Sequence, residues 1–260
     1  MRIVRFRDGS SVYWGIAREG YVQHMPEAPF WFSDDGEIAG KIDELALLTP
    51  VDPGKIVCVG LNYEAHVTER DPNRKVPTEP VLFMKPPSAL IGNGEEIRIA
   101  NPDHETHHEA ELVVVIGKRA HCVDVESSRD YVLGYTCGND VSDRDLQAQD
   151  GQFVRAKGFD TYAPIGPWIE TKLDPTKLKI SCDVNGEIRQ NSSTSKMIWG
   201  VDALISFISH VMTLEPGDII MTGTPHGVSR LNTGDVCTIA IQGIGSLENP
   251  VRNRSEVNGG

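Results

Sequence analysis

Two carboxylates, Glu109 and Glu111, stand two residues apart at the start of a strongly apolar run. The run, Leu112–Ile116, is short, rich in β-branched residues and closed by Gly117, which predicts a buried strand. Because side chains alternate along a strand, the two carboxylates should point the same way. Burying two like charges without compensation is unfavourable. A divalent cation would remove that penalty.

A third carboxylate, Asp140, ends the apolar stretch YTCGND. Together with Glu109 and Glu111 it would make an all-oxygen site, the kind that suits Mg²⁺ or Mn²⁺. The alternative is that Glu109 and Glu111 are surface residues at a strand end, in salt bridges with Lys or Arg. Spacing alone does not decide between these two interpretations.

Three histidines beside the acidic pair, His104, His107 and His108, offer zinc as a further alternative. His104 and His108 stand four apart, the spacing of two zinc ligands on a helix. However, Pro102 precedes them and the predicted strand follows directly, which leaves little room for a helix. The spacing therefore gives zinc little support, and a zinc enzyme built on these three histidines stays a rival interpretation.

Candidate acid–base groups lie elsewhere in the chain. His66 and Glu69 stand three apart in a stretch that looks helical, where a carboxylate can orient an imidazole and raise its basicity. A solvated surface pair is the plain alternative. Lys157, which precedes a turn, could hold a substrate carboxylate or be an ordinary surface residue. The loop TGTPHG (222–227) follows a strand, and such loops can bind oxyanions or be simple turns.

Composition limits the class of partner. With 25 basic and 37 acidic residues the formal net charge is −12, which disfavours nucleic acid and anionic membranes as partners. A small anionic substrate is still compatible with this charge, because a bound cation can reverse the sign inside a pocket. The N-terminus lacks a signal-peptide core and no apolar run approaches the roughly 18 residues of a membrane span, so we expect a cytoplasmic protein. The five cysteines lack CxxC spacing and are expected to be buried thiols: Cys58, Cys122, Cys137, Cys182 and Cys237.

Hydrophobic patterning predicts a mostly β architecture with some α, without the strand–helix alternation of a doubly wound sheet. The clearest strand-like runs are residues 2–7, 12–16, 55–60, 80–85, 112–116, 180–184, 218–222 and 236–241. Helical stretches are expected at residues 42–48, 127–132 and 197–212. The punctuation PVDPG (50–54) suggests a small N-terminal β-containing domain, 1–50, a main domain, 51–254, and a frayed tail, 255–260.

Several longer stretches together resemble the fumarylacetoacetate hydrolase family. They occur in order and at family-like spacing between residues 55 and 252: VCVGLNY (57–63) followed by His66, PVLFMKP (80–86), HEAELVVVIG (108–117), GYTCGNDVSDRD (134–145), KGFDT (157–161), VNGEIRQ (184–190), LEPGDII (214–220) and TGTPHGV (222–228). The first 50 residues resemble only loosely the small cap domain of some bacterial members.

This resemblance implies a catalytic domain of the mixed β-sandwich roll type, a homodimer, and one bound Mg²⁺ or Mn²⁺. The family's metal carboxylates fall on Glu109, Glu111 and Asp140. Its catalytic groups fall on the lid dyad His66 and Glu69 and on the active-site lysine, Lys157. Its substrate contacts fall on Tyr63, Arg144, Gln147 and Thr224.

The resemblance also implies a small 2-oxo or 2,4-dioxo acid as substrate, processed through a metal-stabilised enolate. We expect C–C bond hydrolysis of an acylpyruvate or decarboxylation of an oxaloacetate-type acid. The alternative is an isomerase of 2-hydroxyhepta-2,4-diene-1,7-dioate, or an oxo-acid tautomerase, in aromatic catabolism. A domain that binds metal or ligand without catalysis is disfavoured, because His66, Glu69 and Lys157 are all present. Ser229 departs from the family pattern, since many relatives continue Gly-Val-Gly there, and it should affect the loop beside the substrate.

Overall fold

The computed structural model describes residues 1–25, 36–69 and 71–254. Strands account for 43% of the chain and helices for 18%, which confirms the predicted mostly β class with mixed sheets. The predicted tail, residues 255–260, lies outside the described residues. No helix in the described ranges has both the length and the apolar character needed to cross a membrane.

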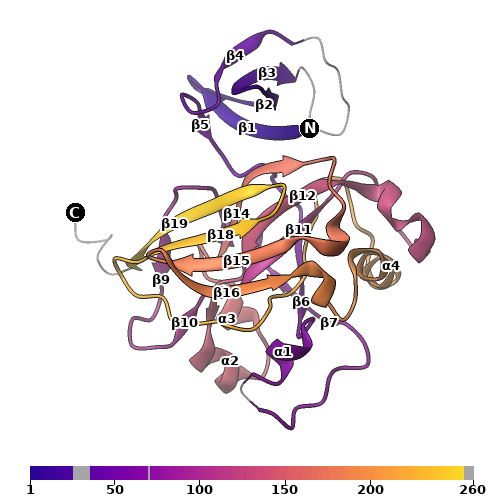
Figure 1. Cartoon of the computed structure of the whole chain (residues 1–260), viewed down its shortest axis with the longest axis vertical. Coiled ribbons are helices and arrows are strands. Elements are labelled where there is room, and N and C mark those ends of the chain that lie inside the picture. Colours follow the sequence, from indigo (N-terminus) through magenta and orange to yellow (C-terminus); the bar gives the residue numbers. More distant parts are fainter. Residues whose placement is uncertain (26–35, 70, 255–260) are drawn as a thin grey trace.

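The larger sheet has 12 strands and runs from the N-terminal strands into the main body (Figure 1). Its main path is, in order, β4 (Ile38–Lys41), β3 (Tyr21–Met25), β2 (Ser11–Arg18), β1 (Arg2–Asp8), β14 (Ala163–Glu170), β12 (Val132–Asn139), β11 (Ala110–Ile116), β17 (Ile219–Met221), β6 (Ile56–Gly60) and β7 (Val81–Lys85). Two short strands leave this path: β5 (Ala46–Leu47) pairs with β1, and β8 (Leu90–Ile91) pairs with β14.

A second sheet of five strands packs against the main body. Its order is β16 (Glu187–Ser193), β15 (Lys179–Val184), β18 (Val236–Ile241), β19 (Gly245–Asn253) and β9 (Ile97–Ile99). A two-stranded ribbon, β10 (Thr106–His107) with β13 (Ser142–Asp143), lies next to the start of β11 and the end of β12 in the sequence.

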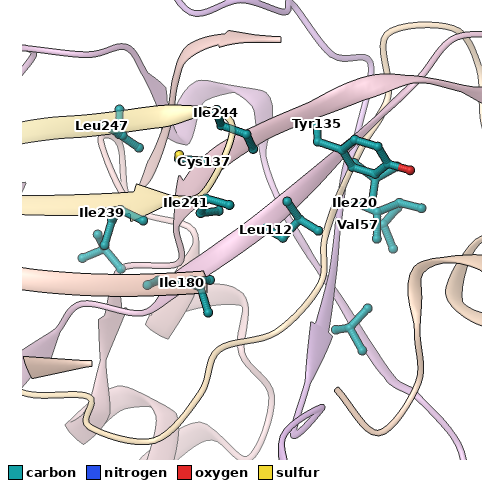
Figure 2. Packing of buried hydrophobic residues seen from close by; sticks show 14 of the residues in the cluster. Val57, Leu112, Tyr135, Cys137, Ile180, Ile220, Ile239, Ile241, Ile244 and Leu247 are labelled. Carbon is teal, nitrogen blue, oxygen red and sulfur yellow. The ribbon is translucent and has the colours of Figure 1, made fainter. Parts of the chain in front are cut away.

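The main core lies between the two sheets. Figure 2 shows Ile180, Ile239 and Ile241 of the smaller sheet packed toward Leu112 of β11 and Ile220 of β17, all of them buried. Alternation along β11 sends its even-numbered residues to this core and Val113 and Val115 to a second apolar cluster on the opposite face. Because both faces of β11 are covered, successive residues are all buried, which explains the continuous apolar run in the sequence.

Within the described ranges, four α-helices interrupt the sheets: α1 (Glu64–Val67), α2 (Arg144–Asp150), α3 (Val154–Lys157) and α4 (Val201–Val211). Figure 1 places α1, α2 and α3 together, at the end of the main body far from the N-terminal strands. Short 3₁₀ helices are η1 (Pro87–Ala89), η2 (Val125–Tyr131), η3 (Pro175–Lys177) and η4 (Thr194–Lys196).

Three helix predictions require correction. Residues 42–48 form a turn and β5, because Leu47 pairs opposite Phe6 of β1 and completes the small N-terminal core. Residues 127–131 fall in the 3₁₀ helix η2, where the Ser128 hydroxyl donates to the carbonyl of Val125, and Val132 begins β12. The predicted helix 197–212 begins four residues later, because Asn62 binds the backbone amides that precede it.

The prediction that all five cysteines are buried is wrong for Cys122. That thiol is exposed, whereas Cys58, Cys137, Cys182 and Cys237 are buried as expected. Cys122 lies in a loop, outside the strands that bury the others.

Candidate active site

Strand pairing brings the three predicted metal carboxylates together. In the antiparallel register of β11 and β12, Ala110 faces Asn139 and Glu111 faces Gly138, so Glu109 and Asp140 meet at the strand ends. The backbone N–H of Asp140 donates to the carbonyl of Glu109 at 2.9 Å. One oxygen from each of Glu109, Glu111 and Asp140 lies within 4.8 Å of the others, and all three residues are buried.

The ammonium group of Lys157, at the end of α3, lies between two of these carboxylates. It donates to Glu109 Oε2 at 2.9 Å and to Asp140 Oδ2 at 2.5 Å. Burial opposes charge on Lys157, but the attraction of Asp140 and Glu109 outweighs it and raises the lysine pKa. Burial likewise raises the pKa of Glu109, yet Lys157 and Arg144 overcome it and hold that pKa well below its usual range. Both groups are therefore charged at neutral pH.

Glu111 has the opposite environment. Burial, then the negative charges of Asp140 and Glu109, raise its pKa well above the ordinary value. Glu111 Oε2 accepts the backbone N–H of Gly223 at 2.7 Å. Glu111 is thus a buried carboxylate with no cationic side chain bound to it in the described part of the chain.

Lys85, on β7, is a buried cation that the sequence interpretation did not assign to the site. Its ammonium donates to the carbonyls of Val141, Lys157 and Tyr162 at 2.6–3.0 Å, which uses all three of its hydrogens. It also lies 2.7 Å from Asp140 Oδ1. Because the three carbonyls take the Lys85 hydrogens, this contact is chiefly an ion pair, and Asp140 Oδ1 is a buried oxygen without a well-formed hydrogen bond among the described residues.

These two observations fit a divalent cation. Glu111 has no ion pair with a cationic side chain among the described residues, Asp140 Oδ1 is left without a well-formed hydrogen bond there, and both residues belong to the cluster of three converging carboxylates. A hard, oxygen-seeking ion such as Mg²⁺ or Mn²⁺ matches this donor set. The cluster could therefore hold a metal through Glu109, Glu111 and Asp140.

The neighbouring histidines have other partners. His104 Nδ1 contacts Asp143 at 2.8 Å and His107 Nε2 contacts Glu105 at 3.2 Å, whereas His108 Nδ1 and Nε2 contact Gln190 and Ser229. Burial lowers the pKa of His108 to about 4. The three rings do not form a shared ligand group within the described residues, although His104 clusters with Asp143 and Asp145.

Two predicted substrate contacts, Arg144 and Gln147, lie on the same face of α2, a helix that the sequence interpretation missed. The side chain of Asp143 caps its start and Gly151, with φ 67°, ends it; both are recognisable signals in the sequence. Arg144 donates to Glu109 Oε1 and, at 2.8 Å, to Gln147 Oε1. The helix thus holds a guanidinium group against a metal-site carboxylate.

Of the predicted dyad, His66 lies on α1 and Glu69 follows two residues after the end of that helix. His66 Nδ1 and Glu69 Oε2 are 2.8 Å apart, and Glu69 Oε1 accepts the backbone N–H of Gly227 at 2.7 Å. Burial raises the pKa of Glu69, but the hydrogen bonds from His66 and Gly227 outweigh burial and lower it. An ionised Glu69 accepts the Nδ1 hydrogen of His66, which leaves Nε2 as the free ring nitrogen.

A cavity of about 270 Å³ joins these groups. Glu109, Glu111, Lys157, Arg144, Gln147, His66 and Thr224 line it, together with residues that the sequence did not indicate, among them Arg74, Phe83 and Phe153. Phe83 lies under the Lys157 ammonium, 4.9 Å from ring centre to nitrogen, and its ring contacts that of Phe153.

Tyr63 does not belong to this lining. It lines a neighbouring pocket with Glu64 and Thr68, and its buried hydroxyl has no hydrogen-bond partner among the described residues. Burial and the charge of Glu111 raise the pKa of this phenol. A substrate contact at Tyr63 stays a prediction, as do the roles of the residues that line the cavity.

Comparison with known proteins gives the family. The sequence model described as fumarylacetoacetate (FAA) hydrolase C-terminal matches residues 55–252. The chain belongs to the fumarylacetoacetate hydrolase family. A second model, Rv2993c-like N-terminal, matches residues 1–50. Hydrolases, isomerases and tautomerases are named within this family, so its members are enzymes.

Individual relatives extend this result. Protein Rv2993c of Mycobacterium tuberculosis is 46% identical over 240 residues, which cover 91% of this chain and 90% of that protein. The oxaloacetate tautomerase fahd2 of Xenopus laevis is 42% identical over 220 residues, 80% of this chain and 68% of that protein. A crystal structure of 5-carboxymethyl-2-hydroxymuconate delta-isomerase from Mycobacterium smegmatis is 39% identical with a TM-score of 0.88, covering 98% of this chain and all of that one.

Proposed function

We propose that this member of the fumarylacetoacetate hydrolase family is a Mg²⁺- or Mn²⁺-dependent tautomerase of a small 2-oxo acid. The observation that carries the proposal is a single cavity lined both by an oriented imidazole, His66, and by the carboxylates Glu109 and Glu111. Relatives named as a tautomerase and an isomerase support it. This conclusion shifts the sequence-based preference for C–C hydrolysis or decarboxylation toward proton transfer.

The chain's own groups perform the proton transfer. Glu69 orients His66, whose free Nε2 removes a proton from the carbon next to the 2-oxo group and returns it to the oxygen, giving the enol. A divalent cation held by Glu109, Glu111 and Asp140 would supply Lewis-acid stabilisation of the negative charge on that oxygen. Lys157 and Arg144 keep Glu109 ionised.

Product analysis tests this proposal. With Mg²⁺ or Mn²⁺ present, the protein should interconvert the enol and keto forms of oxaloacetate faster than metal alone, and should exchange the C3 hydrogens with D₂O without releasing CO₂. Proton NMR and the ultraviolet absorbance of the enol measure both. Release of pyruvate and CO₂, or of acetate and pyruvate from acetylpyruvate, would instead identify the decarboxylase or the hydrolase.

Hydrolysis is the second candidate, and the same dyad favours it. His66 Nε2 could take a proton from water as readily as from carbon, because Glu69 stabilises the resulting imidazolium in both cases. The two candidates differ in the atom that His66 deprotonates.

Arg74 leads us to expect a substrate with a second carboxylate. It lines the cavity from the exposed loop 71–80, and no ion pair is recorded for it among the described residues. Arg74→Gln should raise KM about tenfold for a dicarboxylic oxo acid such as oxaloacetate and leave KM for acetylpyruvate unchanged. Steady-state kinetics on both substrates measures this, with Lys75→Gln as the matched control for loss of one charge. Equal changes for both substrates would show that Arg74 contacts no distal carboxylate.

We also propose that the chain forms a homodimer, as the family resemblance implies. Multi-angle light scattering should then give twice the chain mass of 28.6 kDa. A single-chain mass at micromolar concentration would refute this.

A further inference from the structure

Gln190 lies at the centre of a buried hydrogen-bond arrangement behind the cavity. It belongs to β16 and is fully buried. Its Oε1 accepts the backbone N–H of Ala110 at 2.9 Å and faces His108 Nδ1 at 3.1 Å. Its Nε2 donates to the carbonyl of Pro225 at 2.7 Å and to Thr224 Oγ at 2.8 Å.

The backbone fixes which end of this amide faces Thr224. A backbone N–H can only donate, so the atom beside Ala110 must be the amide oxygen. A carbonyl can only accept, so the atom beside Pro225 must be the amide nitrogen. Rotating the amide by 180° would break both contacts inside the protein, where an unpaired polar group is costly. The group presented to Thr224 is therefore an N–H donor.

This orientation determines what Thr224 can offer to a ligand. Its oxygen accepts from Gln190, so its own hydrogen is available for a different acceptor. Thr224 also lines the cavity that holds Glu109 and Glu111. Among the described residues the hydroxyl has no recorded acceptor, so the acceptor can come from a bound molecule.

We propose that Gln190 is a positioning residue that makes the Thr224 hydroxyl a donor to an anionic oxygen of the substrate. The inference rests on the proposed function and deepens it, because it specifies which atom type the site selects beside the carboxylates. A carboxylate or enolate oxygen can accept the hydroxyl hydrogen, which Gln190 leaves available to the cavity. An ammonium group, which carries donors only, cannot accept this hydrogen.

Binding of oxalate, a planar dianion that mimics the enolate of a 2-oxo acid, tests the inference. Isothermal titration calorimetry on the Mn²⁺-loaded full chain gives the Kd. Thr224→Val should weaken binding 10- to 100-fold and Thr224→Ser less than threefold. Gln190→Glu presents an acceptor to Thr224, so the threonine hydroxyl donates to the new carboxylate and no longer into the cavity. This variant should therefore lose as much oxalate affinity as Thr224→Val. Gln242→Glu, the same exchange at an exposed position, is the control.

The double variant separates positioning from a general structural effect. In the Thr224→Val background, Gln190→Glu should change the oxalate Kd less than threefold, because the hydroxyl that it acts through is gone. The Mn²⁺ Kd should stay within twofold in every variant. If Gln190→Glu does not fold, Gln190→Met replaces it, with a smaller single-variant loss and the same absence of effect in the Thr224→Val background.

Two outcomes overturn the inference differently. If wild-type protein binds oxalate and the losses at Gln190 and Thr224 multiply in the double variant, Gln190 does not act through Thr224, while the proposed function stands. If the Mn²⁺-loaded wild type binds no oxalate, the proposed function fails and the inference fails with it.

Discussion

Glu111→Gln is expected to raise the melting temperature of the metal-free protein while it abolishes activity. Burial and two neighbouring carboxylates raise the pKa of Glu111, so the fold disfavours its ionised form. Glutamine keeps the shape and removes the charge. Without the third carboxylate the cation loses a ligand, so we expect at least about a 10³-fold loss of kcat/KM and no thermal stabilisation by Mn²⁺.

The raised pKa of Glu111 also fixes how the stability of the metal-free protein changes with pH. Because the folded-state pKa of Glu111 is above the unfolded one, its contribution to stability is fully present below the unfolded value and is lost as the pH rises through the folded value. The stability advantage of Glu111→Gln should therefore grow with pH in metal-free protein. A difference of about 1 kcal/mol would shift the melting temperature by about 2–4 °C in a chain of this size. Scanning calorimetry in chelator from pH 5 to pH 8 measures it.

Glu109→Gln is the matched control, with the opposite expected sign. Glu109 accepts hydrogen bonds from the ammonium of Lys157 and the guanidinium of Arg144. Neutralising Glu109 leaves these two buried cations without their anionic partner. We expect a loss of about 3 kcal/mol in the free energy of unfolding of the metal-free protein. If both glutamine variants shifted the melting temperature in the same direction, the assignment of different charge environments to the two residues would be wrong.

His66→Ala should lower kcat about 10²- to 10⁴-fold and leave Mn²⁺ affinity within about twofold. A positioned general base contributes a factor of this size, and His66 is not one of the three clustered carboxylates. Turnover measured together with Mn²⁺ binding by electron paramagnetic resonance separates the two effects. Glu69→Gln should give a smaller loss, since an amide can still accept the His66 N–H but cannot stabilise an imidazolium.

Normal turnover by His66→Ala would remove the dyad from the mechanism, whatever substrate is identified. Loss of metal binding in the same variant would mean that His66 supports the carboxylate cluster. Val67→Ala, a change on the same short helix at a buried apolar residue, controls for disturbance of α1.

The sequence predicted well those parts of the fold that short-range patterns determine. The buried strand after Glu111 follows from a run of β-branched residues, and the same alternation places Glu111 on the face of Val113. The convergence of Asp140 with this pair depends on the register of β11 against β12, which no local pattern encodes. The position of Asp140 at the end of an apolar stretch made it a candidate, and the family resemblance supported it, whereas spacing alone left the pair open to a surface interpretation.

The failures have physical reasons of the same kind. Residues 42–48 have helix-compatible spacing, yet pairing of Leu47 with Phe6 decides their conformation. Lys85 ends an apolar strand and could have been taken for a solvated lysine, but three carbonyls from distant segments enclose its ammonium. No pattern in the sequence indicated roles for Arg74 and Gln190, because their positions at and behind the cavity depend on the tertiary fold.

The loop that follows β17 has a consequence for how the two halves of the site communicate. Its Gly223 amide binds Glu111, and four residues later its Gly227 amide binds Glu69. One short stretch of backbone thus contacts both the carboxylate cluster and the His66–Glu69 dyad. Ion binding by the carboxylate cluster is therefore linked to the position of the dyad. Such linkage is reciprocal. An ion held by the carboxylates would favour the dyad in its observed position, and the dyad in that position would favour binding of the ion.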